Sequence, residues 1–278
     1  MSRARVAVIM PGFNVGPTVE RALLALEPFV GAGIDAVVFI DNHSADDTRE
    51  RVGRIQARNP VLGPALTRIE NARNHGYGGS MKIGLAHVLG RDFTHCLFLH
   101  SDDQGDNARI AAGFLEVLRR EPEVELILAS RFHPRAQVGD YSLIRRLGNG
   151  GFNLLMRFVT GVGQSDAGTG IACMQTRLAG EAPYPNFSDG LFFNLMLNVF
   201  LLRRQGVRCV EIPLRWADSS IGSTVVPWRH VVTMSTLLLG YGVRRLRGHP
   251  GFVDPRGPRA DWLEEYPHLI APTLKELP

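Results

Sequence analysis

Two carboxylates and two further polar side chains follow shortly after a short apolar run in this chain. The tetrapeptide Ser101-Asp102-Asp103-Gln104 comes after Cys96-Leu97-Phe98-Leu99, a pattern typical of a buried strand that ends in solvent. Carboxylate and amide oxygens are the hard ligands that Mg2+ and Mn2+ prefer. The sequence therefore predicts a site for a metal-bound phosphate here, with a plain acidic turn as the alternative.

A third carboxylate, Asp41, follows the apolar run Ala36–Ile40. At the end of a strand it could accept a hydrogen bond from the imide or amide of a nucleobase. The alternative is a helix N-cap or a turn, a role that Ser44 or Asp46 could also fill.

A glycine-rich loop, Asn74-His75-Gly76-Tyr77-Gly78-Gly79, precedes a predicted helix whose first turns include Ser80 and Lys82. Backbone amides at a helix start, together with the helix dipole, can bind an anion. The loop lacks Walker spacing, and it follows the third predicted strand rather than the first, which does not fit a dinucleotide fingerprint. These features indicate a nucleotide bound without a P-loop or a Rossmann cofactor.

Short β-branched runs alternate with amphipathic stretches along the chain. Predicted strands cover residues 6–10, 36–40, 66–70, 95–99, 125–129, 171–175 and 208–212. Predicted helices cover 17–29, about 46–57, 79–89, 108–119, 143–158 and 191–205. This order predicts an α/β fold with a mainly parallel sheet flanked by helices, whose ligands collect at the carboxyl ends of the strands. The polar clusters, including Pro11-Gly12-Phe13-Asn14, fall at those ends.

The composition indicates a globular protein of a reducing compartment. A chain of 278 residues with 45% hydrophobic content can bury one large α/β core or two modest ones. Its three cysteines lie far apart and fit neither a disulfide framework nor a zinc site. The N-terminal run Arg3–Ile9 is too short and too strand-like for a signal peptide. We therefore expect a cytoplasmic protein.

The C-terminal part of the chain is basic. Between Arg203 and Arg259 there are ten arginines and three acids. This favours anionic partners such as diphosphates or lipid head groups, with a solvated basic face as the alternative. The run Val231–Val243 is too short to span a bilayer and predicts either a buried helix or one on a membrane surface, which for a cytoplasmic protein would be the inner face of the cell membrane. The residues after Gly248 predict an irregular tail.

The strand-end motifs together resemble those of family-two glycosyltransferases. Val8-Ile9-Met10-Pro11-Gly12-Phe13-Asn14 is similar to the family's opening Val-Ile-Pro-x-Tyr-Asn, and the segment from Ile40 to Thr48 resembles its Val-Asp-Asp-Gly-Ser-x-Asp-x-Thr. The segment from Asn74 to Leu85 resembles its Asn-x-Gly-x-Gly-x-Ala loop and helix. Within the family, the likeness is greatest to polyprenyl-phosphate sugar transferases of the dolichol-phosphate mannose synthase type, and it covers residues 5 to 225.

The resemblance continues in the second half. Ala129-Ser130-Arg131-Phe132 resembles the family's Gly-Ser-Arg-Tyr, where the Arg meets phosphate. Residues 145–149 resemble the family's Arg-rich helix start, and residues 165–170 resemble its Ser-Asp-x-x-Thr-Gly segment. Residues 211–216 resemble the strand that precedes the family's Arg-x-x-Gly-x-Ser-Lys loop. That loop is 218–224 here and lacks the Arg and the Lys. By this resemblance Arg131 and Asp166 are the catalytic candidates. Asp166 would be the carboxylate on the acceptor side, with a turn-forming role as the alternative and Asp189 as a second carboxylate.

The metal motif departs from the family pattern at one of its ligand positions. The family's Asp-Ala-Asp-Leu-Gln aligns with His100-Ser101-Asp102-Asp103-Gln104. The resemblance implies Asp102 and Gln104 as ligands of Mn2+ or Mg2+, with His100 in place of the first Asp. A neutral imidazole can bind Mn2+ but suits Mg2+ less well. The alternative for His100 is a satisfied histidine that faces the diphosphate.

The resemblance implies a GT-A-type fold and inverting transfer of a sugar from a UDP- or GDP-linked donor. The expected nucleotide-binding residues are Pro11, Phe13, Asn14, Asp41, Asn74, Gly76, Gly79, Lys82, Ser101 and Asp102. A catalytic domain over 1–225 would comprise a nucleotide-binding half, 1–105, and an acceptor half, 106–225, followed by an amphipathic helix, 226–248, and an irregular tail, 249–278.

The predicted acceptor is a polyprenyl phosphate. The alternative is a soluble hydroxyl compound, and a third reading is a catalytically silent nucleotide-sugar binding protein. The sequence leaves open whether the protein contacts a membrane peripherally and whether it forms a homo-oligomer. No nucleic acid partner is expected.

Overall fold

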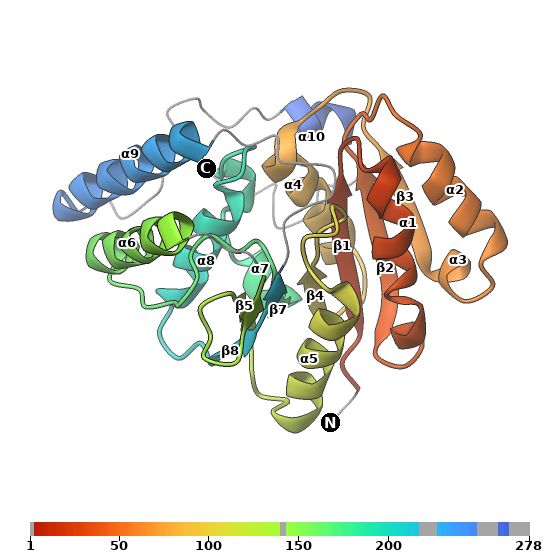
Figure 1. Ribbon diagram of the computed structural model, residues 1–278, viewed down its shortest axis with the longest axis horizontal. Coiled ribbons are helices and arrows are strands. Elements are labelled where there is room, and N and C mark those ends of the chain that lie inside the picture. The colour runs from red at the N-terminus through yellow and green to blue at the C-terminus, as the bar shows by residue number, and fades with distance from the viewer. Residues whose placement is uncertain (1–2, 140–142, 217–226, 249–260, 267–278) are drawn as a thin grey trace.

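The computed structural model describes residues 3–139, 143–216, 227–248 and 261–266, and a seven-stranded sheet forms its centre (Figure 1). The strands are β1 (Val6–Gly12), β2 (Ile34–Asp41), β3 (Leu66–Glu70), β4 (His95–Phe98), β5 (Leu126–Ser130), β7 (Ala172–Gln175) and β8 (Cys209–Pro213). They lie in the order β3-β2-β1-β4-β7-β5-β8, and only β7 runs antiparallel to its neighbours. The predicted mainly parallel sheet flanked by helices is confirmed.

The longer helices lie close to the predicted ranges, whereas the three shortest, α3, α7 and α10, were not predicted. They are α1 (Gly16–Leu24), α2 (Thr48–Arg58), α3 (Leu62–Ala65), α4 (Gly76–Leu89), α5 (Asn107–Arg120), α6 (Leu143–Thr160), α7 (Thr176–Gly180), α8 (Phe193–Leu202), α9 (Pro227–Leu246) and α10 (Asp261–Glu265). Short 3-10 turns cover Glu27–Phe29 and Tyr184–Asn186. Within the first half, α1 ends at Leu24, earlier than predicted, and α4 begins at Gly76 because the predicted glycine loop itself forms its first turn.

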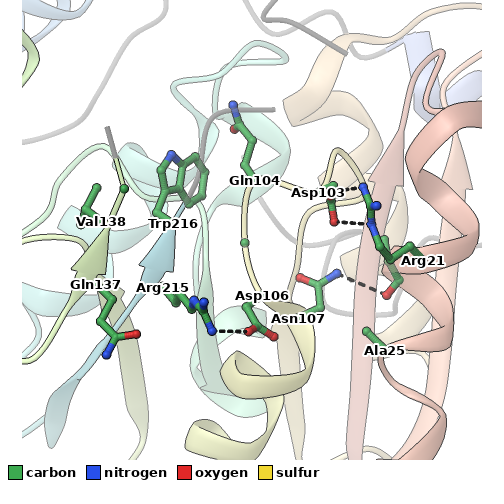
Figure 2. Close-up of a pocket in the computed structure, with 13 residues that line it drawn as sticks. Arg21, Ala25, Asp103, Gln104, Asp106, Asn107, Gln137, Val138, Arg215 and Trp216 are labelled. Atoms are coloured by element: carbon green, nitrogen blue, oxygen red, sulfur yellow. Dashed lines mark hydrogen bonds and ion pairs between the residues drawn. The ribbon is translucent and has the colours of Figure 1, made fainter. Parts of the chain in front are cut away.

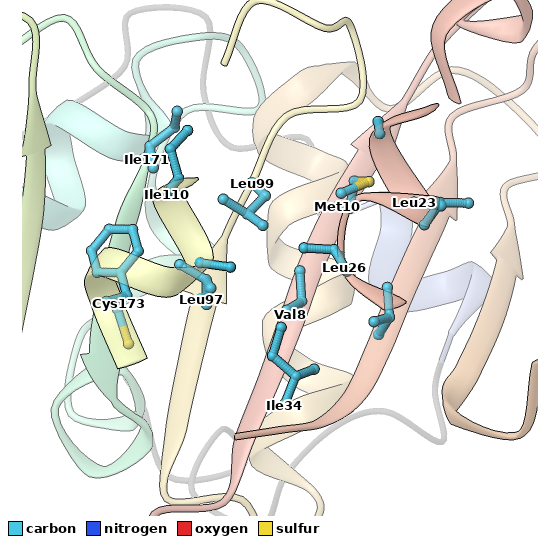
Figure 3. Close-up of a cluster of buried hydrophobic side chains, with 14 of the residues drawn as sticks. Val8, Met10, Leu23, Leu26, Ile34, Leu97, Leu99, Ile110, Ile171 and Cys173 are labelled. Atoms are coloured by element: carbon cyan, nitrogen blue, oxygen red, sulfur yellow. The ribbon is translucent and has the colours of Figure 1, made fainter. Parts of the chain in front are cut away.

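One face of the sheet packs against α1, α2, α3 and α5. Alternate residues of β1, such as Val8 and Met10, point to this side, as the period of two in a strand requires. They pack with Leu23 of α1, and Ile110 of α5 packs nearby against Leu97 and Leu99 at the end of β4 (Figure 3). This core fixes the end of β4, which is followed by the loop that contains Asp102 and Gln104.

The other face of the sheet packs against α4, α7 and α8. Ala7 and Ile9 of β1 contribute to this core together with Met81 of α4 and Phe193 of α8. A Cβ built at Gly84 would lie 2.5 Å from Ile9 Cγ2, so a glycine is needed where α4 crosses β1 closely. Helix α4 therefore lies tightly on the strand whose end carries Pro11 and Asn14.

Helices α6 and α9 lie side by side at one end of the molecule (Figure 1). Met156 of α6 and Leu238 of α9 are buried between them and α8. In the part of the chain that the structure describes, no helix has both the length and the apolar character needed to cross a bilayer.

Besides α3 and α7, two further features were not predicted from the sequence. A small parallel sheet joins β6 (Gln137–Val138) to β9 (Arg215–Trp216), strands too short to leave a periodic pattern. Within the tail that was predicted to be irregular, α10 packs onto the molecule, with Trp262 fully buried in the core beside α4 and α8. The predicted division of the chain into functional halves stays a prediction.

Candidate functional site

The ends of β2, β1 and β4 meet at one edge of the sheet. In the register of β1 and β2, Gly12 is paired with Asp41, and Asn42 N–H donates to Gly12 O at 2.8 Å. On the other side of β1, Leu99 N–H donates to Ile9 O at 3.1 Å. The loops that begin at residues 13, 42 and 99 are therefore neighbours, which is the arrangement that the sequence predicted for its polar clusters.

Asp41 lies at this edge, with its side chain 2% exposed. Its carboxylate accepts hydrogen bonds from Ser44 N–H at 3.1 Å and from Arg49 Nε at 2.7 Å. The hydrogen bond to Asp41 raises the pKa of the Arg49 guanidinium, which keeps its charge beside the carboxylate. The bond to Ser44 is the turn role that the sequence left open, and contact with a nucleobase stays a prediction.

The loops after β1, β2 and β4 hold one another through side chains. Asn14 N–H donates to Ser44 Oγ at 2.9 Å, and Ala45 N–H donates back to Asn14 Oδ1 at 2.8 Å. Asn14 has φ 53°, a left-handed conformation that Asn adopts more readily than most residues. Ser101 Oγ donates to Pro11 O at 2.7 Å. Three predicted nucleotide-binding residues thus shape the edge, while Phe13 stays 41% exposed beside them.

Asn74 belongs to an amide network between β2 and the loop after β3. Asn42 Nδ2 donates to Asn74 Oδ1 at 2.8 Å, and Asn42 Oδ1 accepts from Asn71 Nδ2 and from His75 N–H. Gly76 N–H donates to the same Asn74 oxygen at 2.8 Å. The network fixes the loop before α4.

The start of α4 is covered by a segment from the second half of the chain. Gly78 N–H donates to Asp189 O at 2.7 Å, and Gly79 N–H donates to the same oxygen at 3.2 Å. A Cβ built at Gly78 would lie 2.1 Å from Ser188 O, so the glycine permits this close approach. The predicted anion cradle is thus occupied by a backbone carbonyl, and direct phosphate binding by these amides requires the carbonyl to move.

Lys82 also contacts Asp189, but through the carboxylate of that residue. Its Nζ donates to Asp189 Oδ1 and to Phe187 O, both at 2.6 Å, and its side chain is fully buried. Lys82 therefore fastens α4 to the segment before α8. Its predicted nucleotide contact stays a prediction, and the sequence could not show this role because Asp189 lies over a hundred positions away along the chain.

The two catalytic candidates bind each other. Arg131 donates to Asp166 through its backbone N–H at 2.9 Å, through Nε at 2.8 Å and through Nη2 at 2.8 Å. Gly168 N–H also donates to Asp166 Oδ1 at 3.2 Å. The Asp166 side chain is 1% exposed and the Arg131 side chain 11%. With both oxygens occupied, Asp166 orients Arg131 and is poorly placed to act as a free base.

Asp102 and Gln104 lie on the loop that leaves β4. Gln104 N–H donates to Asp102 Oδ1 at 3.3 Å, while the neighbouring Asp103 turns away and pairs with Arg21 of α1 (Figure 2). Asp103 has φ 63°, which reverses the chain at this point. The two adjacent carboxylates thus have different partners, and the role of Asp102 as a metal ligand stays a prediction.

His100 is enclosed by side chains from three other segments. Its ring packs edge-on against Tyr77 at 6.3 Å and Trp216 at 5.9 Å between centroids. A Cβ built at Gly170 would lie 2.8 Å from His100 Nε2 and 2.5 Å from Asn194 Nδ2. Burial lowers the pKa of His100, which favours a neutral imidazole, despite the opposing effect of Asp102. The His100 ring is thus packed among other side chains, and both its role as a metal ligand and its position facing the diphosphate stay predictions.

The residues fit a metal that is bound jointly with a substrate. In 3–139, 143–216, 227–248 and 261–266, no three His, Cys, Asp or Glu side chains come together in a way that could hold a metal ion. Asp102 and Gln104 still offer two oxygen ligands. Mg2+ usually takes one or two carboxylates and completes its shell with substrate phosphates and water. The donor set therefore suits a diphosphate-bound Mg2+ or Mn2+ rather than a closed protein site.

Several residues of the site were missed by the sequence reasoning. Asn194 Nδ2 donates to Tyr77 Oη at 2.6 Å, and the Arg131 guanidinium lies over the Trp216 ring at 5.3 Å. Trp216 is the last residue of segment 211–216, which resembles the family, and this resemblance could have marked it as a site residue. Asn194 lies in the apolar helix α8 and belongs to no motif that could have marked it as a site residue. The side chains of Arg145 and Arg146 and the loop 218–224 lie outside the described residues.

Solved structures with the same fold include glucosyl-3-phosphoglycerate synthase from Mycobacterium tuberculosis. Its complex with Mn2+ and UDP-glucose has 16% sequence identity and a TM-score of 0.63, over 91% of this chain and 81% of that chain. Its complex with Mn2+, UDP and phosphoglyceric acid has 14% identity and a TM-score of 0.60, over 91% and 80% of the two chains. At this identity the likeness shows the fold. No curated protein matches the chain.

The sequence itself matches a family profile over more than half of its length. The match covers residues 7–177, from the start of β1 to α7, and includes the ends of β1, β2 and β4 and the Arg131–Asp166 pair. On this evidence the chain belongs to glycosyl transferase family 2.

Proposed function

We propose that the chain transfers a sugar from a nucleoside-diphosphate sugar to a hydroxyl group of a small soluble acceptor. The observation that carries the proposal is the placement of Asp41 at the end of β2 and of Asp102 on the loop after β4, the two strands that flank β1, in a chain of glycosyl transferase family 2. Ligands of such sheets bind at the carboxyl ends of strands. Asp41 would contact the base and Asp102 the diphosphate end of the donor.

A divalent ion would be held by Asp102 and Gln104 together with the donor diphosphate. When bound, Mn2+ or Mg2+ supplies positive charge that stabilises the leaving nucleotide. Complexes of glucosyl-3-phosphoglycerate synthase contain Mn2+ or Mg2+ with UDP, which supports this expectation. The Arg131 guanidinium, oriented by Asp166, would add a second positive charge at the phosphates.

Fewer observations bear on the acceptor than on the donor. Glucosyl-3-phosphoglycerate synthase, which shares the fold, has been captured with the soluble acceptor phosphoglyceric acid, and this favours a small hydroxyl compound. A hydroxyl acceptor must lose a proton. Since Asp166 is fully hydrogen-bonded and Asp189 pairs with Lys82, either carboxylate would have to exchange a partner before it could accept that proton.

A polyprenyl phosphate is the second candidate acceptor, because one surface would suit a membrane. The α6–α9 surface exposes six large apolar side chains: Leu154, Phe158, Val232, Leu239, Val243 and Leu246. Neither helix sequence contains Asp or Glu, whereas arginines occur in both. Apolar and cationic groups together favour an anionic lipid surface. An acceptor phosphate is already anionic and needs no base.

Donor hydrolysis and transfer test the proposal together. Purified protein is incubated with UDP-glucose or GDP-mannose and Mn2+, alone, with 3-phosphoglycerate, or with polyprenyl phosphate in detergent. The proposal predicts metal-dependent nucleotide release that the soluble acceptor increases. No release with any nucleotide sugar of a wider panel would favour the catalytically silent alternative.

Vesicle binding separates the two acceptors. For the lipid candidate, vesicles of phosphatidylglycerol should sediment the protein and phosphatidylcholine vesicles should not. Serine at Phe158 and Leu246, which are 87% and 89% exposed, should abolish sedimentation, while serine at Leu24, 42% exposed on α1, should not. Transfer only to 3-phosphoglycerate without vesicle binding would exclude the lipid candidate.

A further inference from the structure

The short helix α10 packs against the loop that connects β3 to α4 (Figure 1). Near its start, Trp262 is fully buried in the core. At its end, Glu265 contacts the loop, and Tyr266 packs against the same core as Trp262. Isolated helices shorter than about 12 residues are marginal in water, so these tertiary contacts determine where α10 lies.

Both carboxylate oxygens of Glu265 bind this loop. Oε1 accepts a hydrogen bond from Ala72 N–H at 2.6 Å, and Oε2 lies 2.7 Å from His75 Nε2. Burial opposes the ionisation of Glu265, but the hydrogen bonds from Ala72 and His75 outweigh it and hold the pKa of the carboxyl below its ordinary value. An ionised carboxylate only accepts, so His75 Nε2 carries the proton. The His75 side chain is 5% exposed and that of Glu265 19%, so water competes little for these bonds.

Tyr266 connects α10 to the amide network at the end of β2. Its hydroxyl donates to Glu70 O at 2.9 Å and to Asn71 Oδ1 at 3.0 Å, as a shared hydrogen bond. Asn71 in turn donates from Nδ2 to Asn42 Oδ1 at 3.1 Å and from its backbone N–H to Asp41 O at 2.9 Å. A single residue, Asn71, therefore separates α10 from Asp41, the residue proposed to contact the base.

We infer that Glu265 is a positioning residue for the donor nucleotide, because it holds the loop between β3 and α4 through Ala72 and His75. Asn74, an expected nucleotide-binding residue, lies between these two points of attachment, and Gly76 follows directly. A loop that is ordered before its ligand arrives binds it more tightly, since the apparent dissociation constant rises as the competent fraction falls. The inference rests on the proposed donor. Its argument comes from contacts of this chain, as α10 lies beyond the matched residues 7–177.

Three substitutions in the full chain separate this role from general stability. Glu265→Ala removes both hydrogen bonds to the loop. Glu264→Ala is the matched control, because Glu264 is the adjacent residue of α10, carries the same charge and is exposed. Glu265→Gln retains an oxygen for Ala72 N–H and an amide that can donate to a neutral His75. The melting temperature of each variant sets a temperature at which all of them are folded.

Hydrogen exchange shows whether the loop depends on Glu265. Without ligand, a peptide that contains Ala72 and His75 should exchange faster in Glu265→Ala than in wild type, because the Ala72 amide loses its acceptor. The same peptide in Glu264→Ala should exchange at the wild-type rate. Equal exchange in the two alanine variants would overturn the inference at its first step, whatever the donor is.

Titration calorimetry with UDP and with GDP in Mn2+, and the kinetics of nucleotide release, test the link to the donor. We expect Glu265→Ala to weaken nucleotide binding and raise the donor KM about tenfold, with kcat within about twofold of wild type. Glu264→Ala and Glu265→Gln should stay close to wild type. The inference fails if Glu265→Ala binds nucleotide as tightly as Glu264→Ala, if it lowers kcat and leaves KM unchanged, or if Glu265→Gln is as weak as Glu265→Ala. A wild-type protein that binds neither nucleotide would overturn the proposed donor and this inference with it.

Discussion

Asp166 accepts three hydrogen bonds from Arg131, one from the backbone N–H and two from the guanidinium. The two residues come from loops on different strands, after β5 and before β7, and they are buried together beneath Trp216. A guanidinium held on two sides has a fixed orientation before any substrate binds. Such preorganised charge is worth more in a site from which water is excluded.

Arg131→Met and Asp166→Asn should therefore impair the enzyme to a similar extent. We expect each substitution to lower the rate of nucleotide release about 100-fold, and the double variant to be no worse than either, because the residues act as a unit. Steady-state kinetics at a temperature where all variants are folded checks this. If Asp166→Asn were far more damaging than Arg131→Met and removed the acidic limb of the pH–rate profile, Asp166 would be a base instead.

Lys82→Met should destabilise the protein. It leaves Asp189 partly buried without its cation, and removal of one partner from a buried pair typically costs about 3–5 kcal/mol. Since the Asp189 side chain is 16% exposed, the lower end of that range is expected here, about 3 kcal/mol. Urea denaturation measures the change.

The double variant Lys82→Met with Asp189→Asn shows whether Lys82 also serves the donor. We expect it to recover part of the lost stability, because no charge is then left unpaired. An unchanged KM for the donor in this variant would exclude a direct contact between Lys82 and the nucleotide.

Gly78→Ala should be severely destabilising, because its Cβ would come within 2.1 Å of the Ser188 carbonyl oxygen. The backbone must move, and overpacking of this kind costs about 1–3 kcal/mol. Gly150→Ala is the matched control: it is an exposed glycine within α6 whose Cβ would meet nothing within 4 Å. That substitution should stabilise the helix by about 1 kcal/mol. Equal melting temperatures for the two variants would contradict the packing described for α4.

The stability of the protein should fall as the pH drops from 7 to 5. Burial lowers the pKa of both His100 and His95 below the ordinary histidine value of about 6.5. Below that value the unfolded chain binds protons that the folded chain resists, so the free energy of unfolding increases with pH in this window. His100→Gln should reduce the slope. A free energy of unfolding that is constant from pH 7 to 5, measured in urea, would mean that these histidines are not held neutral.

The sequence could predict the sheet and the position of the site, because both depend on local patterns. The period of two in β1 and the helical periods of α1 and α5 are legible in the chain, and polar residues at strand ends mark the binding edge. The motif alignment selected Asp102 as the metal ligand, which stays a prediction, and in the structure Asp103 pairs with Arg21.

Partners that come from distant parts of the chain could not be predicted. The Asp189 carbonyl at the start of α4, the Lys82–Asp189 pair and the Arg131–Asp166 pair each join segments with no local signal of their contact. The strands β6 and β9 are two residues each, too short for periodicity to appear. The burial of Trp262 could not be predicted either, because it lies in a Pro- and Gly-rich tail without a helical or strand pattern and is buried only by tertiary packing.

The most direct test of the account compares Asp102→Asn with Asp103→Asn. The carboxylates are adjacent, but only Asp102 is assigned to the metal, and Asn tolerates the positive φ of Asp103. Nucleotide release from UDP-glucose or GDP-mannose is measured across a range of Mn2+ concentrations. We predict that Asp102→Asn loses about 100-fold in kcat/KM with a weaker Mn2+ response, while Asp103→Asn keeps the wild-type response. Undiminished Mn2+-dependent release by Asp102→Asn would contradict the assignment of the metal site and with it the proposed function.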